Sequence, residues 1–183
     1  TQTLQLVTDQ MAKVNGINTA EVMAEVNAVK ALNITTQEAH TTVQKLMFAQ
    51  LDVAKATNIA RVAQDVAVMA NVNSSEALDR MMLGIVTGQT RVLHNMNLQV
   101  SMIRQLREIR AEKRARGEKG EPTELEKRQS MFNAVLAEGA KMYGTYERSM
   151  LTAGKQWYSL QREVQEAQNA IGGEFVPAFG RMV

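Results

Sequence analysis

The sequence predicts an all-α protein in which a compact bundle of short helices is followed by one long, coiled-coil-like helix. Only two prolines interrupt the 183 residues, and proline is the residue that breaks helices most strongly. No stretch shows the sustained alternation of apolar and polar residues between turns that marks a strand. A helix-start pattern recurs in the first half of the chain, and a heptad repeat fills most of the last third.

The helix-start pattern is an apolar residue, then a capping residue, then a glutamate three positions after the cap. The capping residues are Asn18, Thr35 and Asn73. Their side chains can accept hydrogen bonds from the free amides of the first helical turn, and the glutamate can reach back to the amide of the cap. The pattern therefore predicts three helix starts.

Apolar stripes between these starts predict seven short helices before the charged part of the chain. The first carries Leu4, Val7, Met11 and Val14 and stops at Asn15-Gly16. The later ones are a helix ending near Asn33, one carrying Ala39 to Leu51, one from Asn58, one from Ser75 to Thr87 with Gly88 as its cap, one over 90–95 and one from Ser101. Such short connections predict a compact bundle. The intervals between caps are unequal, which disfavours a solenoid.

We expect four segments along the chain. The bundle covers 1–103, a charged helix end and linker covers 104–122, the long helix covers 123–172, and a tail covers 173–183. The chain starts at Thr1 rather than at a methionine, so we expect a longer parent protein.

The long helix is predicted from a capping box and a heptad seam. Thr123 with Glu126 forms the box, and apolar residues then recur at intervals of four and three. A helix of about 50 residues would be ~75 Å long. The expected helix-packing residues are Phe132, Leu136, Gly139, Tyr143, Tyr146, Met150, Ala153, Trp157, Leu160, Val164, Ala167 and Ile171.

Two interpretations of this seam stay open. The seam can associate with a second copy or another protein, which its aromatic residues favour, or it can pack inside its own monomer. Gly139 and Ala153 are small residues within the seam, and Gly139, with Gly144 and Gly154 beside the seam, lowers helix propensity. We therefore expect a neighbouring backbone to approach the helix closely there.

No catalytic or metal-binding pattern is visible. Cysteine is absent, which excludes disulfides and thiolate chemistry. His40 and His94 lie far apart, and neither has a second ligand at metal spacing. No phosphate-binding glycine loop and no nucleophile motif occur. We therefore expect no cofactor, no metal and no enzymatic activity.

The charge pattern argues against nucleic acid and membrane partners. The net charge is only +2. The arginines of 104–116 alternate with carboxylates and have no aromatic residue among them, so we expect a solvated surface rather than a phosphate-binding patch. The longest charge-free stretch near the middle of the chain, 92–103, is shorter than the ~20 residues of a membrane span.

Two stretches together resemble the helical region of bacteriophage tail tape measure proteins. The first, 72–102, contains Ser75-Glu76-Ala77-Leu78, Gly88-Gln89-Thr90-Arg91-Val92-Leu93 and Leu98-Gln99-Val100-Ser101. The second, 125–177, contains Glu126-Lys127-Arg128-Gln129, Asn133-Ala134-Val135-Leu136-Ala137-Glu138-Gly139, Ser149-Met150 with Ala153, Lys155-Gln156, Ser159-Leu160, and Ala170-Ile171-Gly172 followed by Pro177. The resemblance depends on the order and spacing of these short motifs.

The sequence departs from that family at two places. Asn97 stands where the family commonly has a glycine. Asparagine also adopts the left-handed conformation, so we expect the turn to be kept. The charged segment 104–121 matches nothing in the family.

The resemblance implies a structural role. Tape measure proteins are long helical chains that set the length of the tail tube, lie inside it in several copies, and leave the virion around DNA delivery. It implies a homo-oligomer inside the virion, made in the bacterial cytoplasm, with tail tube, tail-tip or tail assembly chaperone proteins as partners. The competing hypotheses are a helical adaptor that binds a partner through the seam, and nucleic-acid binding through 104–116.

Overall fold

The computed structural model describes residues 2–149, 160, 163–164 and 166–168, and this part of the chain is helical without a strand. Its principal helices run in the order α1 (Gln2–Val14), α2 (Thr19–Lys30), α3 (Thr36–Phe48), the 3₁₀ turn η1 (Val53–Lys55), α4 (Ala56–Ala70), α5 (Ser74–Thr87), α6 (Thr90–His94), α7 (Met102–Ala115), α8 (Glu124–Ala140) and α9 (Thr145–Ser149). The predicted all-α class is confirmed for the described residues.

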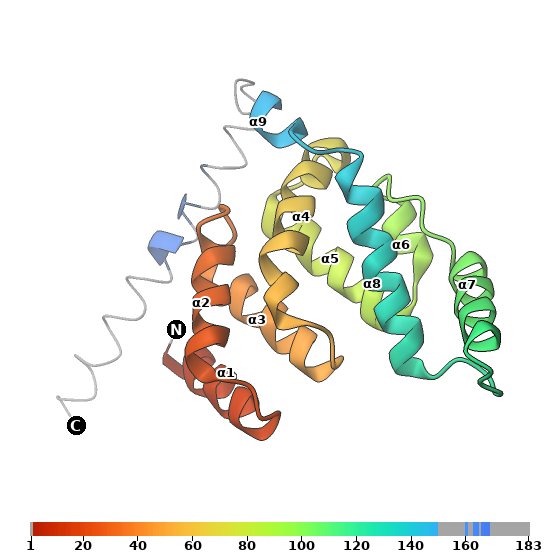
Figure 1. The fold of residues 1–183 in the computed structure, drawn as a ribbon. Coiled ribbons are helices and arrows are strands. Elements are labelled where there is room, and N and C mark those ends of the chain that lie inside the picture. Colours follow the sequence, from red (N-terminus) through yellow and green to blue (C-terminus); the bar gives the residue numbers. More distant parts are fainter. Residues whose placement is uncertain (1, 150–159, 161–162, 165, 169–183) are drawn as a thin grey trace.

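The helices pack around one core (Figure 1). Helices α1, α2 and α3 contact one another, α4 packs along α5, and α8 lies against both α4 and α5. Buried residues of α8, including Phe132 and Val135, belong to the same hydrophobic cluster as Val22 on α2 and Ile59 on α4. The core therefore does not end at the predicted bundle boundary of 103.

The predicted caps form as expected. The Thr35 and Asn73 side chains accept from the amides of Glu38 and Glu76, and Asn18 accepts from Ala20. The reciprocal glutamate contact is present at Thr123, where Glu126 accepts from the cap amide at 2.7 Å. At Thr35 that amide instead donates to Ser75 Oγ on α5.

Most helix ends close with a residue in the left-handed conformation. Asn33, Asn71 and Asn97 have φ of 59°, 55° and 60°. The left-handed turn expected at Asn97 is confirmed, since the amides of Asn97 and Leu98 bond back to α6. The predicted start at Asn58 was wrong, because Asp52 caps η1 and α4 follows directly from Ala56.

The stripe predicted for the first helix was wrong at two of its four positions, since Met11 packs against the core and Leu4 is half-buried as expected. Val7 and Val14 are exposed, whereas Thr8 and Ala12 face the core. The Thr8 hydroxyl donates to Leu4 O and shares a hydrogen bond with His40 Nδ1 at 2.9 Å. His40 is 4% exposed.

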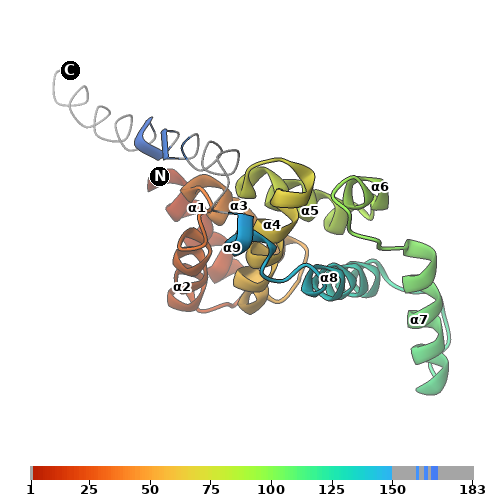
Figure 2. The same ribbon diagram turned by 90° about the horizontal axis from the view of Figure 1, so that it is seen from above.

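The charged segment is more ordered than predicted. Helix α7 continues to Ala115 and packs mainly against α8. Figures 1 and 2 show α7 projecting from the end of the molecule farthest from α1 and α2. Lys113 is buried and bonds to Glu126 Oε1 at 3.0 Å, and Arg110 bonds to Glu121 at 2.6 Å. These contacts tie the C-terminal end of α7 to the start of α8 and to the loop before it.

The single long helix does not form across the described residues. Helix α8 begins at the predicted cap but ends at Ala140, and α9 begins at Thr145. Between them Gly144 has φ +79°, a conformation that ends a helix. The remainder of the predicted helix, from residue 150 on, lies almost entirely outside the described residues.

Candidate helix-packing interface

The N-terminal part of the predicted seam packs into this chain's own core. Phe132 is 0% exposed, and its neighbours Met131 and Val135 are equally buried. Leu136 is half-buried and packs on the same cluster. Because α8 contacts α4 and α5, the seam from 132 to 139 is satisfied within one chain.

Gly139 explains how α8 comes so close to α4. A Cβ placed on Gly139 would lie 2.2 Å from Val62 Cγ1 and 2.5 Å from Cγ2, far inside van der Waals contact. Close approach at this glycine was predicted, and the structure shows that a side chain of the same molecule makes it. Val62 is β-branched and therefore stiff about χ1 in a helix.

The two seam tyrosines have different environments. Tyr143 lies in the turn after α8 and is 70% exposed. Tyr146 on α9 is buried, and its hydroxyl accepts from Asn33 Nδ2 at 2.8 Å. The heptad spacing continues through the turn, but the two positions no longer share one face.

Asp65 on α4 stabilises the break between α8 and α9. Its carboxylate accepts from the Tyr146 amide at 2.8 Å, and this amide, with those of Thr145 and Gly144, acts to lower its pKa. Burial raises the pKa of Asp65 above its ordinary value, against the opposing effect of these amides. The Asp65 carboxylate, which is distant in sequence, thus caps the N-terminus of α9. The heptad pattern gives no sign of this separate short helix.

The rest of the seam is partly outside the described residues. Met150, Ala153, Trp157 and Ile171 belong to that part. Leu160 and Val164 are each 49% exposed, and Ala167 is exposed. Next to them Glu166 accepts from the Thr36 amide at 2.5 Å and from its hydroxyl at 3.1 Å, so a carboxylate from this region caps α3.

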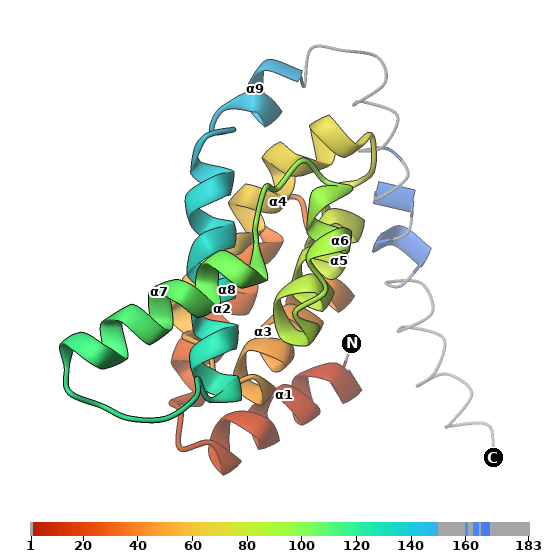
Figure 3. The ribbon, with the colours of Figure 1, turned by 90° about the vertical axis from the view of Figure 1, so that its right-hand side faces the viewer.

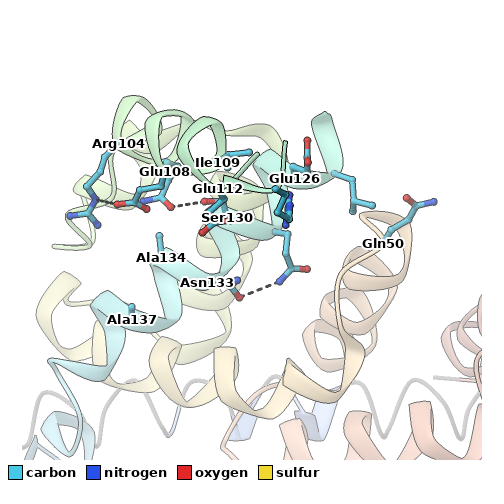
Figure 4. Close-up of a pocket in the computed structure, with 14 residues that line it drawn as sticks. Gln50, Arg104, Glu108, Ile109, Glu112, Glu126, Ser130, Asn133, Ala134 and Ala137 are labelled. Carbon is cyan, nitrogen blue, oxygen red and sulfur yellow. Dashed lines mark hydrogen bonds and ion pairs between the residues drawn. The ribbon is translucent and has the colours of Figure 1, made fainter. Parts of the chain in front are cut away.

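A groove of about 580 Å³ lies between α7 and α8 (Figure 4). Arg104, Glu108 and Glu112 project from α7, and Ser130 and Asn133 line the α8 side. Ser130 Oγ donates to Gln105 at 2.6 Å, and Arg104 pairs with Glu108 at 3.6 Å. The groove offers alternating charges and amides that can hydrogen-bond a polar segment, but no group there is arranged as a nucleophile or acid–base pair.

Among the described residues, no three His, Asp or Glu side chains lie together as a metal site requires. His94 hydrogen-bonds to Val100 O at 2.7 Å and lies on a different helix from His40. None of the described helices has both the length and the apolar composition needed to span a bilayer.

Glu38 is the described carboxyl with the most strongly raised pKa. Burial raises its pKa to about 7, while Lys45 and a hydrogen bond from Thr42 act in the opposite direction. Lys45 itself is paired with Asp79 on α5. The folded state therefore favours protonated Glu38.

We expect a pH dependence of stability from this residue. Because the folded pKa is above the model-peptide value, its protonated form stabilises the fold below pH ~4.5, and that contribution is lost as pH rises to about 7. Glu38→Gln should remove this decline and stabilise the protein at pH 8 by up to about 3 kcal/mol. Urea unfolding at several pH values measures it. Glu76→Gln, at the equivalent position of α5, should leave the decline intact, and an unchanged slope in Glu38→Gln would contradict the assignment.

The roles of Asp65 and Lys113 were not predicted from the sequence. Asp65 had a visible signal, since it lies three residues after Val62 on an otherwise apolar helix face. Lys113 had none, because its partner Glu126 is identified only when α7 turns back onto α8.

Comparisons with protein-family models, curated proteins and solved structures found no match.

Proposed function

We propose that this chain is a structural, non-catalytic module of a long-tailed phage tape measure protein. The support is the order and spacing of the short motifs that resemble that family, together with the physical demands at two of them. Gly88 has φ +72°. Gly139 leaves no room for a side chain beside Val62.

These demands explain why the resembling motifs have their particular residues. Gly88 is needed for the left-handed turn between α5 and α6, and Gly139 is needed for the α8–α4 contact. Similar residues at positions where the backbone or the packing allows few alternatives are stronger evidence for a shared helical framework than a similar composition would be. That correspondence is the observation that carries the proposal.

The proposal places the chain in the virion, inside the tail, in several copies. Its partners would be further copies and tail tube, tail-tip or tail assembly chaperone proteins. In this role its polar groups cap helices and link them to one another rather than catalyse a reaction. Asp65 caps α9, and Lys113 bonds to Glu126.

A helical adaptor is the second candidate. The half-exposed Leu160 and Val164 favour it, since they present an apolar seam edge that a partner helix could cover. In this case the chain would bind one specific protein and would have no relation to tail length.

An in-frame deletion in the phage or prophage that carries the gene separates the two. If the 183 residues lie in the tail as helices placed end to end, their removal should shorten tails by up to about 270 Å at ~1.5 Å per residue. Electron microscopy measures tail length, and mass spectrometry of purified virions should find peptides of this chain. Tails of unchanged length, or virions without those peptides, would leave the adaptor and reject the tape measure role.

A further inference from the structure

A second groove lies between α2 and the η1 turn and has an acidic rim. It has a volume of about 490 Å³. Its floor is apolar, with Ile17, Val22 and Val53 among its lining residues. Three carboxylates, Glu21, Glu25 and Asp52, line it, and no lysine or arginine does. We call this the acidic groove.

The described part of the chain does not neutralise these carboxylates. None of the three forms an ion pair within the described residues. Glu25 Oε2 accepts from the Thr57 hydroxyl at 2.8 Å and from its amide at 3.3 Å. Asp52 Oδ1 accepts from the Ala54 amide at 3.1 Å. These bonds hold two carboxylates in place with one oxygen each, so the rim is a fixed negative site suited to a cation with an aliphatic stem.

The outer face of α7 has the complementary chemistry. Ile103, Arg107, Arg110 and Arg114 recur at intervals of four, three and four, so they share one face. That face is turned away from Gln105 and Ile109, which pack on α8. Ile103 is 65% exposed. We call this the α7 outer face.

Two of its arginines are available to a partner. Arg110 is bonded to Glu121, whereas Arg107 and Arg114 form no ion pair within the described residues. They are seven residues apart, about 10 Å along the helix. Figures 2 and 3 show that α7 extends clear of the helices α1 to α5, so its outer face is open to another molecule.

We propose that the α7 outer face of one copy docks into the acidic groove of a second copy. The guanidinium groups of Arg107 and Arg114 pair with Glu21 and Glu25, and Ile103 with the arginine stems covers the apolar floor. The surfaces are different patches of the chain, so the contact is head-to-tail and adds copies in a row unless it closes into a ring. This inference does not depend on the tape measure role.

A protein carboxylate surface fits the α7 outer face better than nucleic acid does. Glu108 and Glu112 lie on the same helix beside the arginines, which reduces the field that a phosphate backbone would feel. Helix α7 has no aromatic residue for base stacking. The groove is small, so the interface falls in the class below ~1,200 Å² that binds weakly.

Sedimentation velocity of the whole chain at low salt tests the proposal, since salt screens such pairs. The wild-type mass should rise with concentration up to ~1 mM. Two double variants remove one surface each. The arm variant changes the α7 outer face (Arg107→Gln/Arg114→Gln), and the groove variant changes the acidic groove (Glu21→Gln/Glu25→Gln). Each should weaken association about tenfold or more. Mixed together, the two variants should form a complex of one copy of each, because one keeps its groove and the other keeps its arm.

Glu76→Gln is the matched control for the groove variant, because Glu76 occupies the same position in the first turn of α5 as Glu21 does in α2. It should associate like the wild type, and all variants should retain the wild-type helical circular dichroism. A wild type that stays monomeric, variants that associate unchanged, or a mixture that forms no complex would overturn the proposal. Binding of a DNA duplex that the arm variant abolishes, with the wild type otherwise monomeric, would overturn it in favour of nucleic acid.

Discussion

Replacing Phe132 with alanine should lower the free energy of unfolding by about 3–5 kcal/mol, which is the usual cost of removing a fully buried aromatic side chain. Phe132 is among the largest fully buried side chains and joins α8 to the core formed by α2, α4 and α5. Urea denaturation followed by circular dichroism measures the loss. It should be the same at low and high protein concentration, since the contact lies within one chain.

Leu160→Ala is the matched control from the same heptad series. Leu160 is half exposed, so its truncation should cost less than about 1 kcal/mol. A single long seam packed against one partner would instead make the two losses similar. Equal losses, or a Phe132→Ala effect that vanishes on dilution, would show that the seam belongs to an interface between chains.

Gly139→Ala should lower the free energy of unfolding by about 2 kcal/mol, although alanine is the better helix former by ~1 kcal/mol. The added Cβ would come within 2.2 Å of Val62 Cγ1, and overpacking of this kind costs typically 1–3 kcal/mol or more. The clash outweighs the propensity because Val62 is stiff and sits on a helix packed on both sides.

A double-mutant cycle isolates this contact. In a Val62→Ala background the space opens, so Gly139→Ala should become neutral or stabilising, with a coupling of about 2 kcal/mol. Gly117→Ala supplies the comparison. Gly117 has φ +74° and nothing within 4 Å of its added Cβ, so its cost should be conformational and independent of Val62. Additive effects of Gly139→Ala and Val62→Ala would contradict the α8–α4 contact.

Local features of the fold could be predicted from sequence because their physics is local. A cap needs only its own side chain and the next turn. Thr35, Asn73, Ser101 and Thr123 accordingly all accept from the amide three residues on. The left-handed Asn97 follows in the same way from the intrinsic freedom of asparagine.

The break after Ala140 could not be predicted in this way. The heptad spacing is a periodic pattern, and it continues through a turn as readily as through a helix. The group that stabilises the break is Asp65, 81 residues before Tyr146. Its role becomes visible only when α4 and α9 are brought together by packing.

Residue polarity likewise does not predict which face of α1 is buried. The apolar stripe places Val14 in the core, yet Val14 is exposed and Thr8 is buried. Thr8 can be buried because its hydroxyl hydrogen-bonds to His40 and Gln44 on α3 and donates to Leu4 O. Two of these three partners are brought in by tertiary contact, so no pattern within α1 predicts them.

The central claim is that the α8 seam packs on α4 of the same chain. Since the chain has no cysteine, a Val62→Cys/Gly139→Cys variant tests it directly under mild oxidation at low micromolar concentration. A Cβ at Gly139 would lie 2.9 Å from Val62 Cβ, within about 1 Å of the ~3.8 Å of a disulfide. Mass spectrometry of the unreduced protein should show a monomer whose two cysteine peptides are joined to each other. Disulfide-linked dimers, with no joined peptides in the monomer, would contradict the account.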